Sequence, residues 1–252
     1  YLLMKPVPKL QMIAQRLNLS ESTISRALND YSDISKDTKK LVWSVANEMG
    51  YQPNIYARRL ALGKSETIAY LLPFDDNESG GPFINELIAG ISAELSKSGW
   101  DLNILSPSSA EEEIEMFKKI SHNGHISGLV FSRTLVNDPR LEILNNLKIP
   151  FITHGRSHSS ERTAWIDVDN EAVFFEVTKH LYNLGHRLIA HIGGPMRFNF
   201  SNQRLEGWKK AMDHFGLQVP INYHQVSELS FESGIHSMNS LLALKRPPTA
   251  VC

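Results

Sequence analysis

The sequence predicts two parts of different fold class: an all-α helix-turn-helix head with a hinge helix, followed by a larger doubly wound α/β core. Three observations predict this division. Apolar residues recur at helical spacing before residue 51, strand-like apolar segments alternate with helices after residue 65, and the charge changes sign between the two parts. We expect boundaries at 1–51 for the head, 52–64 for the hinge helix and 65–252 for the core.

Charge and composition narrow the function classes. Residues 1–64 hold 10 Lys and Arg against 5 Asp and Glu, whereas the rest of the chain holds 16 against 22. A basic head indicates an anionic partner, nucleic acid first, although a chance fluctuation in so short a segment would look the same. With a single cysteine, no secretory signal and no long apolar run, we expect a cytoplasmic protein without a membrane partner.

Three short helices are predicted in the head. Asn18 tolerates the left-handed conformation that ends a first helix sharply, and Ser20 can cap a second helix directly after it. Ser35 can cap a third helix, and Gly50 stands where that helix should end. The expected buried faces are Leu10, Ile13, Ala14 and Leu17 in the first helix, Thr23, Ile24, Ala27 and Leu28 in the second, and Leu41, Val42, Val45, Ala46 and Met49 in the third.

The first two helices are joined by a very tight turn, as in a helix-turn-helix whose second helix lies in the major groove. That helix leaves polar side chains for DNA, namely Ser20, Glu21, Ser22, Ser25, Arg26 and Asn29. Serine hydroxyls can reach phosphates or base edges, Arg26 can contact guanine with two donors, and Asn29 can reach a phosphate. Glu21 could accept from cytosine or exclude wrong sites. The alternative is an ordinary three-helix bundle with a solvated polar face.

Residues 52–64 predict a short hinge helix that begins at Asn54. Arg58 and Arg59 stand beside Leu60, and basic residues next to an apolar wedge suit entry into the minor groove. A helical linker is the alternative, but a linker has no need for an exposed leucine.

Residues 9–63 resemble the DNA-binding head and hinge of the lactose/galactose-repressor family of bacterial transcription factors. The matching stretches are "MIAQRLNLSESTISRALND", "ISKDTKKLVWSVANEMGYQPN" and "ARRLALGKS". The resemblance implies a homodimer on a near-palindromic operator, with Leu60 as the minor-groove lever and Ala57 as its close-packing neighbour. It places base reading on Glu21, Ser22 and Arg26. Asn18 departs from the commoner glycine, and the Glu21–Ser22 pair differs from the best-known members, so no operator can be carried over.

The core alternates strands with helices, which indicates parallel βαβ units in two subdomains joined by a crossover near residues 156–168. The expected strands are 67–73, 101–107, 126–132, 149–155, 187–194, 222–228 and 249–252. The expected helices are 83–99, 110–124, 139–147, 171–185, 202–216 and 231–244. Ligands of such sheets bind beyond the carboxyl ends of the strands.

The same resemblance extends across the core as a periplasmic-binding-protein-like domain, through "DNEAVFFEVTKHLYNLGHRLIAHIGGP" and "NQRLEGWKKAM". It implies a small effector, usually a sugar, held by the loops after the strands. The matching positions are Phe83, Ser132, Gly155, Arg156 and Arg204. His154, which precedes Gly155, could also hydrogen-bond the ligand. An arginine can hold vicinal hydroxyls or a carboxylate, and Phe83 can stack on a sugar. An ion pair with Glu206 is the alternative for Arg204, and a satisfied strand-end histidine is the alternative for His154.

Two further expectations rest on the resemblance. The "NFSNQR" stretch suggests an effector of the α-glucoside type. The family's α/β core normally continues for several more elements than this sequence has, so we expect the second subdomain to be incomplete here.

Other function classes are disfavoured by the sequence. Ten histidines invite a metal or catalytic interpretation, but no H-E-x-x-H, paired cysteines or G-x-S-x-G are found, so we expect no enzyme, no metal and no cofactor. A solute-binding protein would need an export signal and would not need the head. An architectural DNA binder would lack the core. The favoured prediction is a repressor whose operator affinity is controlled by a sugar-like effector in an interdomain cleft.

Overall fold

The computed structural model describes residues 8–53, 65–73, 81–158 and 163–252. The chain forms two compact units, Tyr1–Lys64 and Ser65–Cys252, and each is described by itself.

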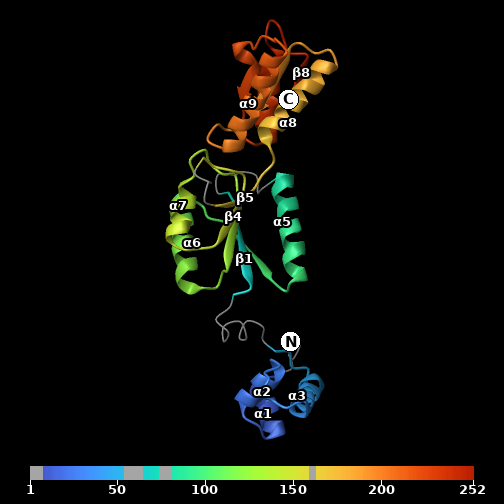
Figure 1. The fold of residues 1–252 in the computed structure, drawn as a ribbon, viewed down its shortest axis with the longest axis vertical. Helices are drawn as coiled ribbons and strands as arrows, with labels where there is room; N and C mark the ends of the chain where they lie inside the picture. The colour runs from blue at the N-terminus through green and yellow to red at the C-terminus, as the bar shows by residue number, and fades with distance from the viewer. Residues whose placement is uncertain (1–7, 54–64, 74–80, 159–162) are drawn as a thin grey trace, which may run out of the picture. The chain divides into compact units, whose positions relative to one another are not determined.

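The head contains helices α1 (Leu10–Leu17), α2 (Glu21–Leu28) and α3 (Lys36–Met49) (Figure 1). Its local signals act as predicted. Asn18 adopts φ 51° at the end of α1, and Gly50 adopts φ 67° at the end of α3. The Ser20 and Ser35 hydroxyls accept hydrogen bonds from the third amide of the helix that each precedes.

The head core is apolar throughout and joins all three helices. Its buried members are Ile13, Ala14, Ile24, Ala27, Leu28, Val42, Val45 and Ala46. Leu41 was predicted to belong to this core, but that prediction is wrong, because 52% of its surface is exposed. Neighbouring residues of a helix lie about 100° apart, and with Val42 at the centre of the buried face Leu41 turns outward.

The first half of the core unit is a sheet sandwiched between helices. Its elements are β1 (Thr67–Leu71), α5 (Gly81–Lys97), β2 (Asp101–Leu105), α6 (Ala110–Asn123), β3 (Gly128–Ser132), α7 (Pro139–Asn146), β4 (Phe151–His154) and β5 (Ala164–Ile166). The strands are parallel in the order β2-β1-β3-β4-β5. Figure 1 shows α6 and α7 on one face of the sheet and α5 on the other. This arrangement buries a cluster around Phe117, Leu129 and Phe131.

Strand β5 was not predicted. It lies inside the segment 156–168 that we interpreted as a crossover, and it pairs with β4 through Ile152↔Ala164 and Thr153↔Trp165. The chain therefore leaves the first sheet only between Ile166 and the next helix. Strand β5 has only three residues, too few to show the alternation of apolar and polar residues that predicts a strand, and all three are exposed.

The second half of the unit contains α8 (Asn170–Asn183), β6 (Ile189–Gly193), α9 (Asn199–His214), the 3-10 turn Ile221–Tyr223, β7 (His224–Val226), α10 (Phe231–Leu242) and β8 (Ala250–Val251). The strands are parallel in the order β7-β6-β8. Helices α8 and α9 cross closely, since a Cβ on Gly207 would lie 2.1 Å from the carbonyl oxygen of Glu171. The doubly wound fold predicted for the core is thus confirmed.

None of the helices in the described ranges combines the length and the apolar character that a membrane span requires.

Candidate nucleic-acid interface and effector site

The outer face of α2 presents the predicted DNA-reading residues. Glu21, Ser22 and Arg26 are exposed, whereas Ile24, Ala27 and Leu28 on the opposite face are buried. A short helix anchored by an apolar face and open on its polar face has the form of a recognition helix.

Two of the predicted DNA contacts, Ser20 and Asn29, also have structural roles in α2, and a third, Ser25, is partly covered. The Ser20 hydroxyl caps the helix and lies 2.8 Å from the Thr23 hydroxyl. The Asn29 side-chain amide donates to the Ser25 carbonyl at 2.8 Å, and the Asn29 backbone donates to the same carbonyl at 3.1 Å. Ser25 is half-buried. Contacts of these three side chains with DNA stay predictions.

Arg26 is held beside the loop that follows α2. Its Nη2 donates to an oxygen of Asp33, and its guanidinium lies 5.8 Å from the centre of the Tyr31 ring. About half of its side-chain surface remains open to solvent. The hinge predictions on Asn54, Ala57 and Leu60 fall outside the described residues.

Arg204, which was predicted to contact the effector, lies on the first turns of α9. Its Nε donates to the side-chain oxygen of Asn170 at 2.8 Å, and its guanidinium lies over the rings of Phe174 (5.4 Å) and Phe200 (4.8 Å). Within the described ranges Arg204 makes these contacts rather than the alternative ion pair with Glu206. Burial lowers the pKa of Arg204 and the charge of Asp167 opposes this, and an arginine stays charged in either case.

A chain of hydrogen bonds joins Arg204 to the other predicted effector arginine, Arg156. The Asp167 carboxylate accepts from the backbone and Nε of Arg156 at 3.2 Å and from the Asn170 amide at 3.2 Å. The Arg156 guanidinium also lies 5.2 Å from the centre of the Trp165 ring. One nearly buried carboxylate therefore stands between two arginines, so the pair is partly neutralised.

Of the remaining predicted effector residues, Ser132 and His154 end β3 and β4, and Phe83 lies in the first turn of α5. The Phe83 ring is exposed and lies 5.1 Å from the His154 ring, so these two residues are brought together. Ser132 is buried, and its hydroxyl lies 2.7 Å from that of Tyr70. The structure thus places Ser132 below the surface, where it fixes Tyr70 rather than offering a free hydroxyl to a ligand.

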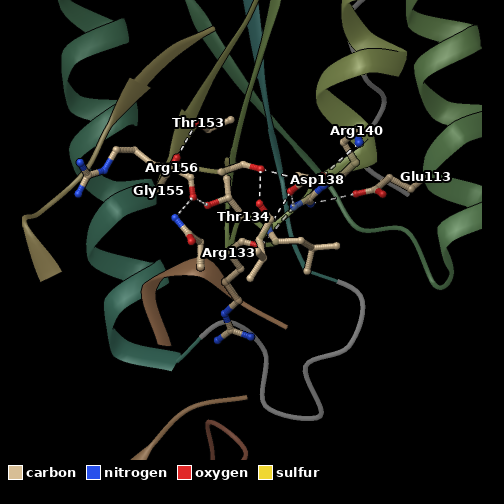
Figure 2. A network of polar contacts seen from close by, with 12 residues as sticks. Glu113, Arg133, Thr134, Asp138, Arg140, Thr153, Gly155 and Arg156 are labelled. Carbon is tan, nitrogen blue, oxygen red and sulfur yellow. Dashed lines mark hydrogen bonds and ion pairs between the residues drawn. The ribbon is translucent and has the colours of Figure 1, made fainter. Parts of the chain in front are cut away.

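The loop after β3 is fixed by a buried ionic network (Figure 2). Arg140 donates to both carboxylate oxygens of Asp138, at 2.9 and 2.6 Å, and to Glu113 at 3.4 Å, while it lies 4.4 Å from the Phe131 ring centre. Burial alone would lower the pKa of Arg140, but Asp138 and Glu113 raise it overall. The network holds the carboxyl end of β3 rigidly beneath the site.

The loops of the two halves meet at Arg156. Its carbonyl accepts from the Thr134 hydroxyl and from the Asn199 amide, both at 2.8 Å, and the Asn199 backbone donates to Thr134 at 3.1 Å. Gly155 adopts φ 109°, and a Cβ there would lie 2.6 Å from the Thr134 hydroxyl. Only glycine permits this approach.

A cluster of buried and half-buried rings from α8, α9 and the second sheet lies next to Arg204. His191 stacks on Trp208 and on His224, with 5.6 Å between ring centres in both pairs, and meets Phe174 edge-on at 5.3 Å. Burial, with the nearby His224, lowers the pKa of His191 to about 4. Its imidazole is therefore neutral at neutral pH and does not repel Arg204.

The sequence did not single out several residues of this site, namely Tyr70, Thr134, Trp165, Asp167, Asn170, Phe174, Asn199 and Phe200. Asp167 and Asn170 carried one readable signal, because polar residues that follow a strand edge in parallel sheets commonly reach the ligand. In the described part of the chain, no group of histidines, cysteines and carboxylates is arranged to hold a metal.

Residues 9–54 match the family model of bacterial regulatory proteins of the lacI family. Residues 65–252 match the model of periplasmic binding proteins and the sugar-binding domain of that family. The chain belongs to the LacI family. It is therefore a DNA-binding transcriptional regulator with a sugar-effector domain, and not an enzyme.

Individual relatives agree with this membership. The regulator AglR of Rhizobium meliloti is 35% identical over 96% of this chain and 68% of its own length. The regulator RafR of Escherichia coli is 31% identical over 96% and 71%. The lac repressor dimer bound to operator and the anti-inducer ONPF shares the fold, with a TM-score of 0.80 and 23% identity over 97% of this chain and 73% of that chain.

Proposed function

We propose that this LacI-family protein is a repressor that binds a near-palindromic operator as a homodimer and responds to a neutral sugar. The observation that carries the DNA-binding part is the α2 surface, where Glu21, Ser22 and Arg26 stand exposed above a buried apolar face. Two such helices related by a two-fold axis would read two half-sites. The proposed site of action is the cytoplasm, where the operator is found.

The proposed effector site is the interdomain cleft at the carboxyl ends of the strands, with Arg204 as its main polar contact. Aromatic rings lie beside the predicted effector residues in both halves: Phe83 beside His154 and Trp165 beside Arg156 in the first, and Phe174 and Phe200 beside Arg204 in the second. Such rings suit the apolar faces of a sugar, while Arg204 and His154 would supply polar groups for its hydroxyls.

A neutral sugar is favoured over a phosphorylated one. Asp167 already pairs with Arg156 and lies close enough to Arg204 to affect its charge. A doubly charged phosphate would have to displace or repel this carboxylate. Sugars of the α-glucoside type remain the first class to test.

The central experiment is selection of binding sites from a random duplex pool by the full chain, with and without a panel of mono- and disaccharides. We expect a near-palindromic consensus whose enrichment changes with one sugar. Enrichment of no motif at moderate salt would contradict the proposal, because phosphate contacts alone carry no sequence information.

Two pairs of arginine variants, each with a matched control, test which residues carry operator binding and which carry the sugar response. Arg26→Ala should cost about 1–3 kcal/mol of operator binding and relax one base position, whereas Arg16→Ala, on α1, should do neither. Arg204→Ala should abolish the sugar response with operator affinity retained, whereas Arg187→Ala, whose guanidinium lies over Tyr182, should leave it intact. A full sugar response in the Arg204 variant would move the effector site elsewhere.

A further inference from the structure

The loop that joins α2 to α3 carries two carboxylates beside the proposed recognition helix, Asp30 and Asp33. A negative charge here repels DNA phosphates, so each carboxylate weakens binding to DNA of any sequence. Asp30 pairs with Lys39 at 2.7 Å, and the hydrogen bond and charge of Lys39 lower the pKa of Asp30. This pair ties the loop to α3. Asp33 instead contacts Arg26, the residue proposed to read guanine.

The loop is fixed at both ends, so the position of Asp33 is defined. The Tyr31 amide donates to the carbonyl of Arg26 at 3.1 Å, and the Ile34 amide donates to the carbonyl of Tyr31 at 3.3 Å. Ile34 packs against the apolar core of the head. Ser35 then caps α3 through its hydroxyl.

The contact leaves most of the Arg26 guanidinium available. In the described part of the chain, only Nη2 of Arg26 donates to Asp33, and a guanidinium carries five N–H donors. The Tyr31 ring lies beside it, 5.8 Å from ring centre to guanidinium carbon. A long, half-exposed arginine loses rotamer freedom when it binds, and a carboxylate and a ring that already restrain it reduce that loss.

We propose that Asp33 is a positioning residue for base reading, because its carboxylate holds the Arg26 guanidinium in the orientation that contacts guanine. The inference rests on the proposed role of Arg26. Asp33 thereby exchanges affinity for selectivity: its charge weakens binding to every duplex, and its restraint on Arg26 favours the duplex with guanine in the right place.

The alternative is that the Asp33 carboxylate competes with DNA for Arg26. It would then have to release Arg26 before DNA can bind. The two roles predict opposite changes when the carboxylate is removed. Without a competitor, affinity for the operator rises more than affinity for unrelated DNA. Without a positioning residue, affinity for unrelated DNA rises more, and selectivity falls.

The test compares Asp33→Asn with the wild-type full chain, on the duplex that the wild type selects and on a scrambled duplex of equal length. Fluorescence anisotropy at one fixed salt concentration gives the two dissociation constants. Asp37→Asn is the control for charge, since Asp37 is exposed in the first turn of α3 and has the same charge. The same comparison in an Arg26→Ala background shows whether the effect passes through Arg26.

For Asp33→Asn we expect the ratio of specific to non-specific affinity to fall by about two- to fivefold, the range of an exposed ion pair. The ratio should be unchanged in Asp37→Asn, and Asp33→Asn should no longer alter it once Arg26 is alanine. An unchanged or increased ratio in Asp33→Asn would overturn the positioning role and leave the proposed function intact. If Arg26→Ala keeps every base preference of the wild type, the proposed role of Arg26 is overturned, and this inference with it.

Discussion

In the helical head every buried residue that the structure describes is apolar, whereas the α/β core buries Asp138, Glu113, His191 and Asn170 among its apolar residues. The head keeps its polar side chains on the surface, where α2 can present them to a duplex. The core uses buried charges and rings to hold loops at the ends of its strands. Both parts therefore fix the positions of polar groups, the head by an apolar core beneath a short helix and the core by buried charges beneath its loops.

Asp138→Ala tests the buried side of this comparison most severely. It should lower the unfolding free energy of the core by about 3–5 kcal/mol, because Arg140 stays buried without its main partner. Urea unfolding followed by circular dichroism measures the change. A loss below about 1 kcal/mol would mean that the network contributes position but little stability.

The buried His191 should make the core lose stability in mild acid, whereas the head contains no histidine. The pKa of His191 is about 4 in the folded protein and near 6.5 when unfolded, so the unfolded chain takes up the proton first as pH falls. The contribution of His191 to the unfolding free energy is fully present above pH 6.5. It is lost as the pH falls from 6.5 to 4, by at most about 1.4 kcal/mol per pH unit.

His191→Phe supplies the control for this pH dependence, since it keeps a ring between Trp208 and His224 but cannot titrate. Urea unfolding at pH 7, 6, 5 and about 4 gives the unfolding free energy at each pH. As the pH is lowered, this free energy should decrease less in the variant than in the wild type. Equal slopes in the two proteins would assign the acid sensitivity to other groups.

Ser35→Ala examines the local signals on which the head depends. Removal of the hydroxyl that caps α3 should cost about 1 kcal/mol and weaken hydrogen-exchange protection in residues 36–49. Ser44→Ala, at an exposed position inside the same helix, should leave protection unchanged or slightly higher. Similar effects of both changes would indicate that tertiary packing, and not the cap, sets the stability of α3.

Glu48→Gln should produce the smallest change and defines the exposed side of the comparison. It breaks the ion pair with Arg16, in which both side chains are more than half exposed, so about 0.2–1 kcal/mol is expected. The effect should shrink further as salt is added during urea unfolding. A cost as large as that of Asp138→Ala would remove the distinction between surface and buried charges.

Most of the head could be predicted because its signals are local. Asn18, Ser20, Ser35 and Gly50 mark helix ends through their own side chains or backbone conformations. Leu41 was the exception, since a helical stripe does not show on sequence grounds where its edge lies. In the core, long apolar strands and helices were predicted well, but the three-residue β5 carried too little pattern to be seen.

The sequence by itself determined the family, the fold class and the positions of the three head helices, because motif spacing and hydrophobic period are local properties of the sequence. The tertiary structure decided what the predicted site residues touch. It buries Ser132 against Tyr70 and places Asp33 beside Arg26. It also links Arg156 to Arg204 through Asp167 and Asn170. Such contacts depend on distances between segments far apart in sequence, or on the exact path of a loop, and neither follows from local propensity.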